Sequence, residues 1–375
     1  MTALHGKGCA KSKHNIGKLW RSLAGGIASL LIATGASAVC LGESPLRGVN
    51  LSGAEFNSRQ LPGEMFRHYT YPSAEDYQYF AQKGANLIRL PIRWERIQQS
   101  LRGELDGGEL AQIRKAVDHA RANGQCLLLD LHNYAAWHGE VLGEGRVSTA
   151  DLVDVWQRLA RELDDPDYVA LGLMNEPFRM DIADWALTAQ QTLTALRDQG
   201  AEHLVAVSGG RWSGVHEWFK VRTGASNSAA FVNLDDPLGR TVLEVHQYLN
   251  EGYSGTDKDC LPPEHFDSMF QNISDWAREN GHQLLLGEFG SPRRQECLES
   301  LDRILQLTSD ADVWRGWAYW AAGAWWGDYF LTVHPIHGKD RPQMEVLEKY
   351  LSPSECSNGL CPEPPEDLTV EQGRN

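Results

Sequence analysis

Two glutamates close apolar runs at distant points of the sequence. Glu176 ends the stretch "LGLMNEP", and Glu288 follows 112 residues later in "QLLLGEFG". A carboxyl group at the end of a hydrophobic segment is costly unless it is paired or hydrogen-bonded. Two carboxyl groups in different surroundings can divide acid and base work, because one holds a proton to donate while the other stays ionised and attacks or activates water.

Glycoside hydrolysis requires such a pair. The alternative is that each glutamate forms a structural ion pair with an arginine or with backbone. We favour a catalytic pair, because aromatic and imidazole side chains accompany both glutamates, and ionic struts would not require them.

Three further side chains in apolar runs fit this chemistry. Arg89, within "LIRLPI", is expected to neutralise and orient Glu288; a structural ion pair with another carboxylate is the alternative. His246 and Tyr248 are two residues apart and so share a strand face. A phenol can hold a nucleophilic carboxylate by a hydrogen bond, and an imidazole can bind a sugar hydroxyl. For His246 and His132, a buried core histidine is the alternative.

Other chemistries lack their motifs. The sequence has neither H-x-H nor H-E-x-x-H, so we expect no metal, and nothing in it calls for a cofactor. "GGRWSGV" lacks the spacing of a phosphate-binding loop, and "AVSGG" lacks the G-x-S-x-G frame of a serine nucleophile.

Tryptophan is abundant, with thirteen in the chain. Six fall at or just beyond the carboxyl ends of the apolar runs, where their rings could stack on sugar faces: Trp94, Trp137, Trp212, Trp320, Trp325 and Trp326. Four fall in segments with helical periodicity and are expected to pack in the core: Trp156, Trp185, Trp218 and Trp276.

The elements that must position these residues recur eight times. The predicted strands are residues 46–53, 87–92, 126–133, 169–176, 204–210, 243–248, 283–290 and 316–323. Helical segments separate them, such as one from Ser73 to Gly84 and one ending at Gly124. Continuously hydrophobic strands that alternate with helices predict a parallel sheet, and eight units predict a single-domain α/β protein, a (β/α)8 TIM barrel. Its active site would lie at the carboxyl ends of the strands. Residues 211–240 are expected to form a long irregular loop.

The two ends of the chain differ from this pattern. Residues 1–38 combine five basic residues, an apolar run and an A-x-A site, which predicts a secretory signal peptide; a retained membrane anchor is the alternative. Residues 39–351 form the predicted catalytic domain and residues 352–375 a flexible tail. Loss of the five positive charges shifts the net charge from −15 to −20. Such an acidic protein is unsuited to nucleic acid or anionic membranes and fits a neutral substrate outside the cell.

Six cysteines remain after the predicted leader. An oxidising compartment would allow them to pair. We expect disulfides between Cys260 and Cys297 and between Cys356 and Cys361, and we expect Cys126 to be a buried free thiol.

Eight stretches resemble glycoside hydrolase family 5, and within it the secreted endo-β-1,4-glucanases. They occur in order from Arg47 to Tyr329: "RGVNLSGAEF", "IRLPIRWERIQ", "DLHNYAAW", "LMNEP", "SGGRWSGV", "VHQYLNEGYSGT", "GEFG" and "YWAAGAWWGDY". The resemblance implies that Glu176 is the general acid/base and Glu288 the nucleophile, and that Asn175 holds the sugar 2-hydroxyl. The residues expected to complete the site are Arg89, His132, Asn133, Trp212, His246, Tyr248, Trp320, Trp325 and Trp326.

The resemblance implies a monomeric endo-β-1,4-glucanase that acts on β-glucan with retention of configuration. A relative that cuts mannan, xyloglucan or xylan is one alternative, because a few loop residues decide between these substrates. A catalytically inactive glycan-binding barrel is another, although the presence of both carboxylates argues against it.

Overall fold

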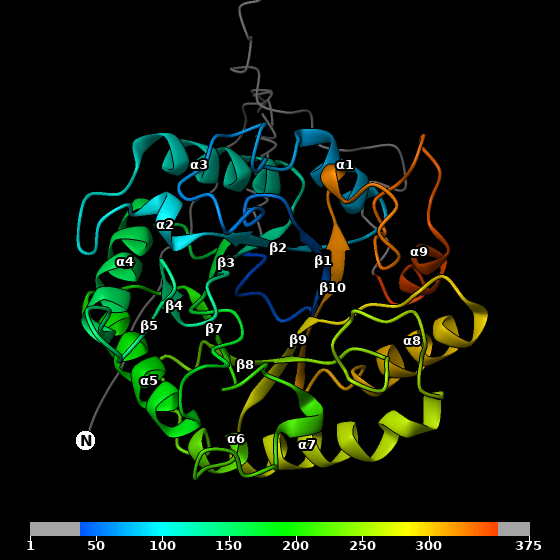
Figure 1. Cartoon of the computed structure of the whole chain (residues 1–375). Coiled ribbons are helices and arrows are strands. Elements are labelled where there is room, and N and C mark those ends of the chain that lie inside the picture. Colours follow the sequence, from blue (N-terminus) through cyan, green and yellow to red (C-terminus); the bar gives the residue numbers. More distant parts are fainter. Residues whose placement is uncertain (1–37, 352–375) are drawn as a thin grey trace, which may run out of the picture. The chain divides into compact units, whose positions relative to one another are not determined.

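Eight parallel strands close into a barrel in the computed structural model, which describes residues 38–351 (Figure 1). Around the barrel their order is β1, β10, β9, β8, β7, β6, β3, β2. The strands are β1 (Leu46–Leu51), β2 (Leu87–Ile92), β3 (Cys126–Leu131), β6 (Val169–Gly172), β7 (Leu204–Ser208), β8 (Thr241–His246), β9 (Gln283–Glu288) and β10 (Trp314–Ala322). The predicted (β/α)8 fold is therefore confirmed.

Helices surround the strands, as Figure 1 shows. They are α1 (Ala74–Gln82), α2 (Trp94–Ile97), α3 (Gly107–Ala122), α4 (Thr149–Glu162), α5 (Ile182–Asp198), α6 (Asn227–Ala230), α7 (Asp267–Asn280), α8 (Gln295–Leu307) and α9 (Pro342–Leu347). As predicted, Ser73 caps α1, where its backbone N–H donates to Asp76 Oδ2 at 2.8 Å. Short 3-10 turns are η1 (Val215–Glu217), η2 (Pro263–Phe266) and η3 (Ala324–Trp326), and a small hairpin joins β4 (Ala136–Trp137) to β5 (Glu140–Val141).

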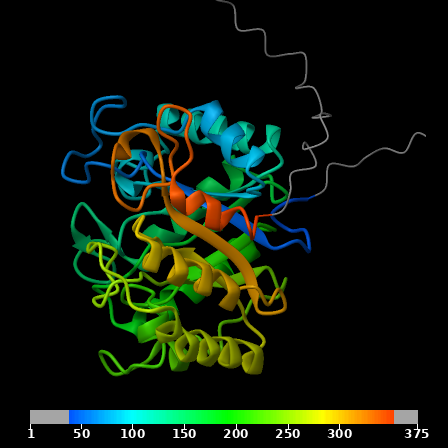
Figure 2. The same cartoon turned by 90° about the vertical axis from the view of Figure 1, so that its right-hand side faces the viewer.

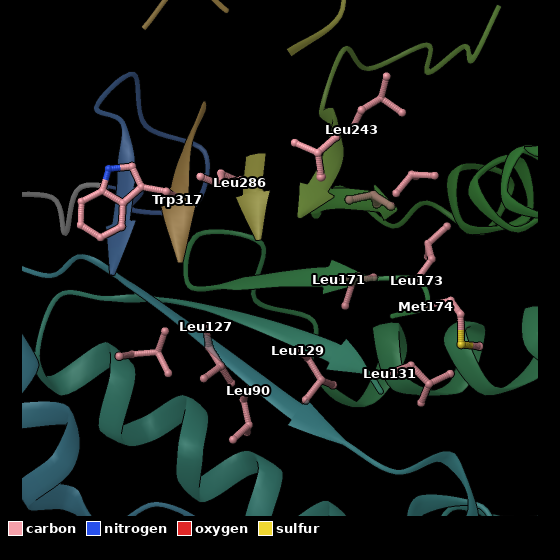
Figure 3. Packing of buried hydrophobic residues seen from close by; sticks show 14 of the residues in the cluster. Leu90, Leu127, Leu129, Leu131, Leu171, Leu173, Met174, Leu243, Leu286 and Trp317 are labelled. Atoms are coloured by element: carbon pink, nitrogen blue, oxygen red, sulfur yellow. The ribbon is translucent and has the colours of Figure 1, made fainter. Parts of the chain in front are cut away.

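Alternate residues of each strand face opposite sides, and this alternation separates two apolar layers. Leu127, Leu129 and Leu131 of β3 face outward and pack in the large core shared with the helices (Figure 3). Cys126 and Leu128 face inward and join a smaller cluster that fills the barrel near the amino ends of the strands. The inward series on β3 then continues as Asp130 and His132, so the barrel interior changes from apolar to charged toward the carboxyl ends.

Several strands end earlier than the sequence predicted. The strand expected at 169–176 stops at Gly172, so Asn175 and Glu176 lie in the loop beyond β6 and not within the strand. The backbone N–H of Asn175 still donates to Leu131 of β3 at 2.9 Å, which ties this loop to the barrel rim. Figure 2 shows the loops after β1, β3 and β8 on one side of the barrel (blue, teal and yellow-green, at left).

Disulfides tie two regions together. Cys260 and Cys297 are bonded, as predicted. Cys126 is bonded to Cys40, so the predicted free thiol is wrong. The two cysteines meet because the segment before β1 crosses the amino ends of the strands. There the Val39 and Cys40 N–H groups donate to Asp167 O. The two cysteines are 86 residues apart, and nothing local in the sequence indicates that they meet.

Other expectations concern loops and chain ends. Residues 211–240 contain only η1 and α6, so the predicted irregular connection is confirmed. The predicted signal peptide, the tail at 352–375 and the Cys356–Cys361 pair lie outside the described residues, apart from Ala38. Within residues 38–351, no helix is both long enough and apolar enough to cross a membrane.

Candidate active site

The two glutamates singled out in the sequence meet above the carboxyl ends of the strands. Glu288 is the last residue of β9, and Glu176 lies four residues beyond β6. A carboxylate oxygen of Glu176 and one of Glu288 lie within 4.8 Å of each other. Glu176 adopts the left-handed backbone region, with φ 42°, which bulky residues rarely occupy. Such strain is frequent at functional sites and here accompanies the turn of the chain after Asn175.

Glu288 has both partners expected from the sequence. Arg89 Nη1 lies 3.0 Å from Glu288 Oε1, and the Tyr248 hydroxyl donates to Glu288 Oε2 at 2.9 Å. Both partners donate hydrogen bonds, and Arg89 also brings a positive charge, so the two carboxylate oxygens are held in one orientation. Burial, followed by the negative charges of Glu288 and Glu176, raises the pKa of Tyr248 well above its usual value and keeps the phenol a donor.

Glu176 has a different partner, His246. The Nδ1 atom of His246 lies 2.7 Å from Glu176 Oε1, and its Nε2 atom lies 3.0 Å from Glu244 Oε1. Both ring nitrogens therefore contact carboxylates, and neither is free for the sugar hydroxyl that the sequence suggested.

Arg89 is the centre of a buried charge network. It is fully buried and donates to Asn50, Asn175 and Glu288, at 2.8, 2.7 and 3.0 Å. Its Nη2 atom also lies 3.2 Å from Asp130 and 2.8 Å from Glu244. Arg89 therefore pairs with Glu288, as expected, and also forms ion pairs with Asp130 and Glu244, which was the alternative. One guanidinium contacts three carboxylates.

These contacts perturb the protonation of the cluster. Burial, opposed by the His246 hydrogen bond and reinforced by the charge of Glu288, raises the pKa of Glu176 to about 7. Burial raises the pKa of Asp130 to about 7 despite the Arg89 charge. Burial would also raise the pKa of Glu244, but the Arg89 charge and the His246 contact lower it overall. Glu176 therefore suits proton donation, and Glu244 stays ionised.

Glu176, His246 and Glu288 could also be considered as metal ligands, since one ligand atom from each lies within 4.8 Å of the others. A metal requires a deprotonated imidazole nitrogen. Burial lowers the pKa of His246, but the charge of Glu288 and the hydrogen bonds to Glu176 and Glu244 raise it overall to about 10. This donor set therefore favours an imidazolium over a metal ligand.

His132 and Trp320 form one wall of the site. Their rings stack with centroids 5.5 Å apart. His132 Nδ1 lies 2.7 Å from Asp130, and its Nε2 lies 3.2 Å from the Tyr134 hydroxyl. Burial holds the pKa of His132 well below its usual value, so the ring is neutral and held in a fixed orientation. Asn133 is engaged entirely by protein: it donates to Glu95 and Ala136 and accepts from the Trp94 backbone, which makes it a supporting residue.

The predicted aromatic platforms differ in how much of each ring is exposed. Trp212 is 43% exposed and stacks on Phe178 at 4.0 Å, and Trp325 is 40% exposed, so both rings can meet a ligand. Trp326 is half-buried and stacks on Tyr329 at 4.4 Å. Trp94 and Trp137 are buried, which makes their proposed sugar contact wrong, because α2 and the β4–β5 hairpin fold these rings inward.

The core tryptophans follow the prediction closely. Trp156, Trp185 and Trp218 are fully buried, and Trp276 is half-buried against the core.

Sequence reasoning missed Asp130 and Glu244. Each lies two residues before a histidine that was singled out, His132 and His246, so the alternation of a strand placed both on the inward face. Gly287 was missed as well, because its role depends on Glu244. A Cβ atom at Gly287 would lie 2.2 Å from Glu244 Oε1, so only glycine leaves room for the Glu244 carboxylate.

Residues 49–323 match the family model described as "Cellulase (glycosyl hydrolase family 5)". The chain belongs to this family. Endo-beta-1,4-glucanase B of Aspergillus niger is 32% identical over 308 residues, which cover 81% of this chain and 89% of the relative.

Two solved structures extend the likeness. The endo-beta-1,4-glucanase Xac0029 from Xanthomonas axonopodis pv. citri is 40% identical with a TM-score of 0.80, covering 82% of this chain and 100% of that one. The structure of XacCel5A in complex with cellopentaose is 46% identical with a TM-score of 0.80, over 82% of this chain and 100% of that chain.

Proposed function

We propose that this family 5 glycoside hydrolase is a secreted endo-β-1,4-glucanase that cleaves internal bonds of β-1,4-glucan with retention of configuration. The observation that carries the proposal is the pair of carboxylates from the β6 and β9 ends, with oxygens within 4.8 Å of each other. Retaining glycosidases hold their carboxyl groups about 5 to 5.5 Å apart, whereas inverting enzymes need ~6.5 to 9.5 Å to admit a water molecule.

Glu288 is the nucleophile in this proposal. Arg89 and Tyr248 hold the carboxylate ionised and oriented, so that one oxygen attacks the anomeric carbon as the bond to the leaving glycosidic oxygen breaks. Glu176 donates its proton to that oxygen in the same step. Water then attacks the glycosyl–enzyme ester while Glu176, now a carboxylate, accepts a proton from it, and Glu288 leaves as a carboxylate.

The substrate follows from the family and its relatives. Endo-β-1,4-glucanase names and a cellopentaose complex among the similar proteins support a β-1,4-glucan. Trp320, which stacks on His132, and the exposed Trp212 and Trp325 offer flat apolar faces of the kind that pyranose rings cover. Asn175 is the proposed partner of the sugar 2-hydroxyl. We propose that the enzyme works as a monomer.

Secretion is supported by two observations of different kinds. Residues 1–38 have the layout of a signal peptide. Two disulfides also occur in the described domain, and such bonds persist mainly in oxidising compartments. Expression of the full chain, followed by amino-terminal sequencing of the protein in the medium, should find a mature end close to Val39. Uncleaved protein confined to the cells would refute secretion.

The stereochemical test uses cellopentaose as the substrate. The anomeric protons are followed by NMR in the first minutes of hydrolysis, before mutarotation mixes the forms. We expect the β-anomer first. Early appearance of the α-anomer would contradict the nucleophilic role of Glu288.

The substrate test compares carboxymethylcellulose, mannan, xyloglucan and xylan at equal concentrations. We expect the highest rate of reducing-end release on carboxymethylcellulose, with a rapid fall in viscosity that marks internal cleavage. A higher rate on another polymer would reassign the substrate, and no release from any of them would favour a glycan-binding barrel.

A further inference from the structure

Glu244 is a buried carboxylate outside the proposed catalytic pair. It lies on β8, two residues before His246, and is 2% exposed. Its Oε1 atom lies 2.8 Å from Arg89 Nη2 and 3.0 Å from His246 Nε2. The absence of a side chain at Gly287 leaves the space that the Glu244 carboxylate occupies. The residue is therefore fixed from both strands, β8 and β9.

We infer that Glu244 is a positioning residue that keeps the His246 ring protonated on both nitrogens, so that His246 can only donate to Glu176. The inference deepens the proposed function and rests on it for the role of Glu176. It concerns one proton, at His246 Nδ1.

The geometry at Nε2 restricts the states of the ring. Glu244 is held ionised beside Arg89, and an ionised carboxylate only accepts hydrogen bonds. His246 Nε2 must therefore carry a proton. The choice that remains is at Nδ1, which either carries a second proton or presents a lone pair to Glu176 Oε1 at 2.7 Å.

The two states of Nδ1 have opposite consequences for Glu176. A lone pair would accept the carboxyl proton of Glu176 and draw it away from the substrate. A proton on Nδ1 instead occupies Oε1 as an acceptor and leaves the acid proton on Oε2, free for the glycosidic oxygen. The same Nδ1 proton stabilises the Glu176 carboxylate after it has donated.

The surrounding charges favour the second proton. The charged and titratable groups around His246 are Glu244 on β8 and Tyr248 just after it, Glu176 after β6, Glu288 on β9, Arg89 on β2, Asp130 on β3 and His132 just after it. Glu288 Oε2 lies 3.7 Å from Nδ1. The nearest groups are carboxylates, and they outweigh the effect of burial, so the pKa of His246 is raised.

The test is a titration of histidine side chains by NMR in the whole enzyme labelled with ¹⁵N-histidine. The spectrum of His246→Asn identifies the His246 signals by their loss. In the wild-type protein we expect both ring nitrogens to remain protonated from pH 5 to pH 8. In Glu244→Gln, which keeps the shape but removes the charge, the pKa of His246 should fall by about one to three pH units.

Asp130→Asn is the matched control. It also removes one carboxylate from Arg89, but Asp130 contacts His132 and not His246. We expect the His246 signals of this variant to stay at their doubly protonated positions up to pH 8, as in the wild type, whereas those of Glu244→Gln should lose the second proton at a lower pH than in the wild type. Equal changes in both variants would mean that Glu244 acts only as a structural partner of Arg89 and would overturn the inference.

Kinetics connect the proton to Glu176. Glu244→Gln should lower kcat more for substrates with poor leaving groups than for aryl glycosides with good ones, with little change in KM. A wild-type His246 that is singly protonated at pH 6 would refute the inference even if Glu244→Gln does not fold. An inactive wild-type enzyme whose His246 titrates as expected would instead refute the proposed function alone.

Discussion

The two glutamates of the site carry the same functional group in different surroundings. Glu288 receives hydrogen bonds from a guanidinium and a phenol, whereas Glu176 is half-buried and faces one imidazole. The first environment fixes both oxygens of the carboxylate with donors, and the second raises the pKa of Glu176. The difference in contacts is what allows two identical side chains to be assigned different roles.

The pH dependence should report the pKa of Glu176. Burial and the charge of Glu288, partly offset by His246, raise this pKa to about 7, and the reactive form is protonated. A rise in pH removes the proton, so kcat/KM should fall as pH passes through about 7 and form the basic limb of the profile. In Glu176→Gln that limb should vanish. A profile that stays flat from pH 6 to pH 9 in the wild type would contradict the assignment.

Loss of the proposed nucleophile should lower activity more severely, and a small added anion should partly restore it. Glu288→Ala should lower kcat by about 10⁴-fold or more, since remote contacts cannot replace a covalent route. Azide should partly restore turnover of an activated aryl β-glycoside and give the α-glycosyl azide. Tyr248→Phe is the control: it removes one hydrogen bond to Glu288, keeps the nucleophile and should not respond to azide. A tenth or more of the activity remaining in Glu288→Ala would exclude Glu288 from the role.

One strand and the loop after it support much of the site. β8 presents Glu244 and His246, and Tyr248 follows two residues later. The next turn is held by Asn250, whose Oδ1 accepts from the Gly255 N–H at 2.9 Å. This contact lays the Gly255 backbone against the Tyr248 ring. The turn therefore supports the Tyr248 ring, and the Tyr248 hydroxyl in turn donates to Glu288.

Gly255→Ala should disturb that support. Gly255 has φ +68°, and a Cβ atom there would lie 2.6 Å from Tyr248 Cδ1, so the ring or the turn must move. We expect kcat to fall about 10- to 100-fold, the range for a small displacement of catalytic groups. Gly252→Ala in the same loop is the control, because its nearest neighbour would be 3.6 Å away. Similar kcat values for the two variants would refute the link between the turn and Glu288.

The candidate active site and the segment before β1 lie at opposite ends of the barrel. The carboxyl ends of the strands carry the charged site, while the amino ends are closed by the segment around Cys40. Arg315 donates to the backbone oxygens of Cys40, Gly42 and Ser44, and the Cys40–Cys126 disulfide fixes the same segment to β3. Stability and activity should therefore respond differently to changes at the two ends.

The two disulfides offer a direct comparison. Cys40→Ser with Cys126→Ser removes a bond across 86 residues, which should cost roughly 4 to 5 kcal/mol and lower Tm by roughly 10 °C, with kcat unchanged at 25 °C. Cys260→Ser with Cys297→Ser removes a bond across 37 residues that ties the loop after β8 to α8. It should lower Tm and also kcat, because that loop supports Tyr248. A fall in kcat in the first variant alone would contradict this division.

The sequence by itself determined the barrel and most of its site. Hydrophobic runs alternating with helices predict eight parallel strands, and the fold then brings every carboxyl end to one rim, so Glu176 and Glu288 could be paired across 112 residues. The partners of Glu288 followed in the same way, because Arg89 and Tyr248 also lie at that rim. The period-two alternation of a strand also places Asp130 and Glu244 on the inward face, because they lie two residues before His132 and His246.

Only the tertiary structure decided which atoms are in contact and which aromatic rings are exposed to solvent. The two nitrogens of His246 contact two carboxylates from different elements, and no spacing in the sequence fixes such a choice. Trp94 and Trp212 both follow predicted strands, yet loop folding buries the first and exposes the second. Cys40 meets Cys126 because the chain crosses the barrel end. Strand patterns repeat over short distances and can be read from sequence, whereas loop paths depend on contacts between distant residues.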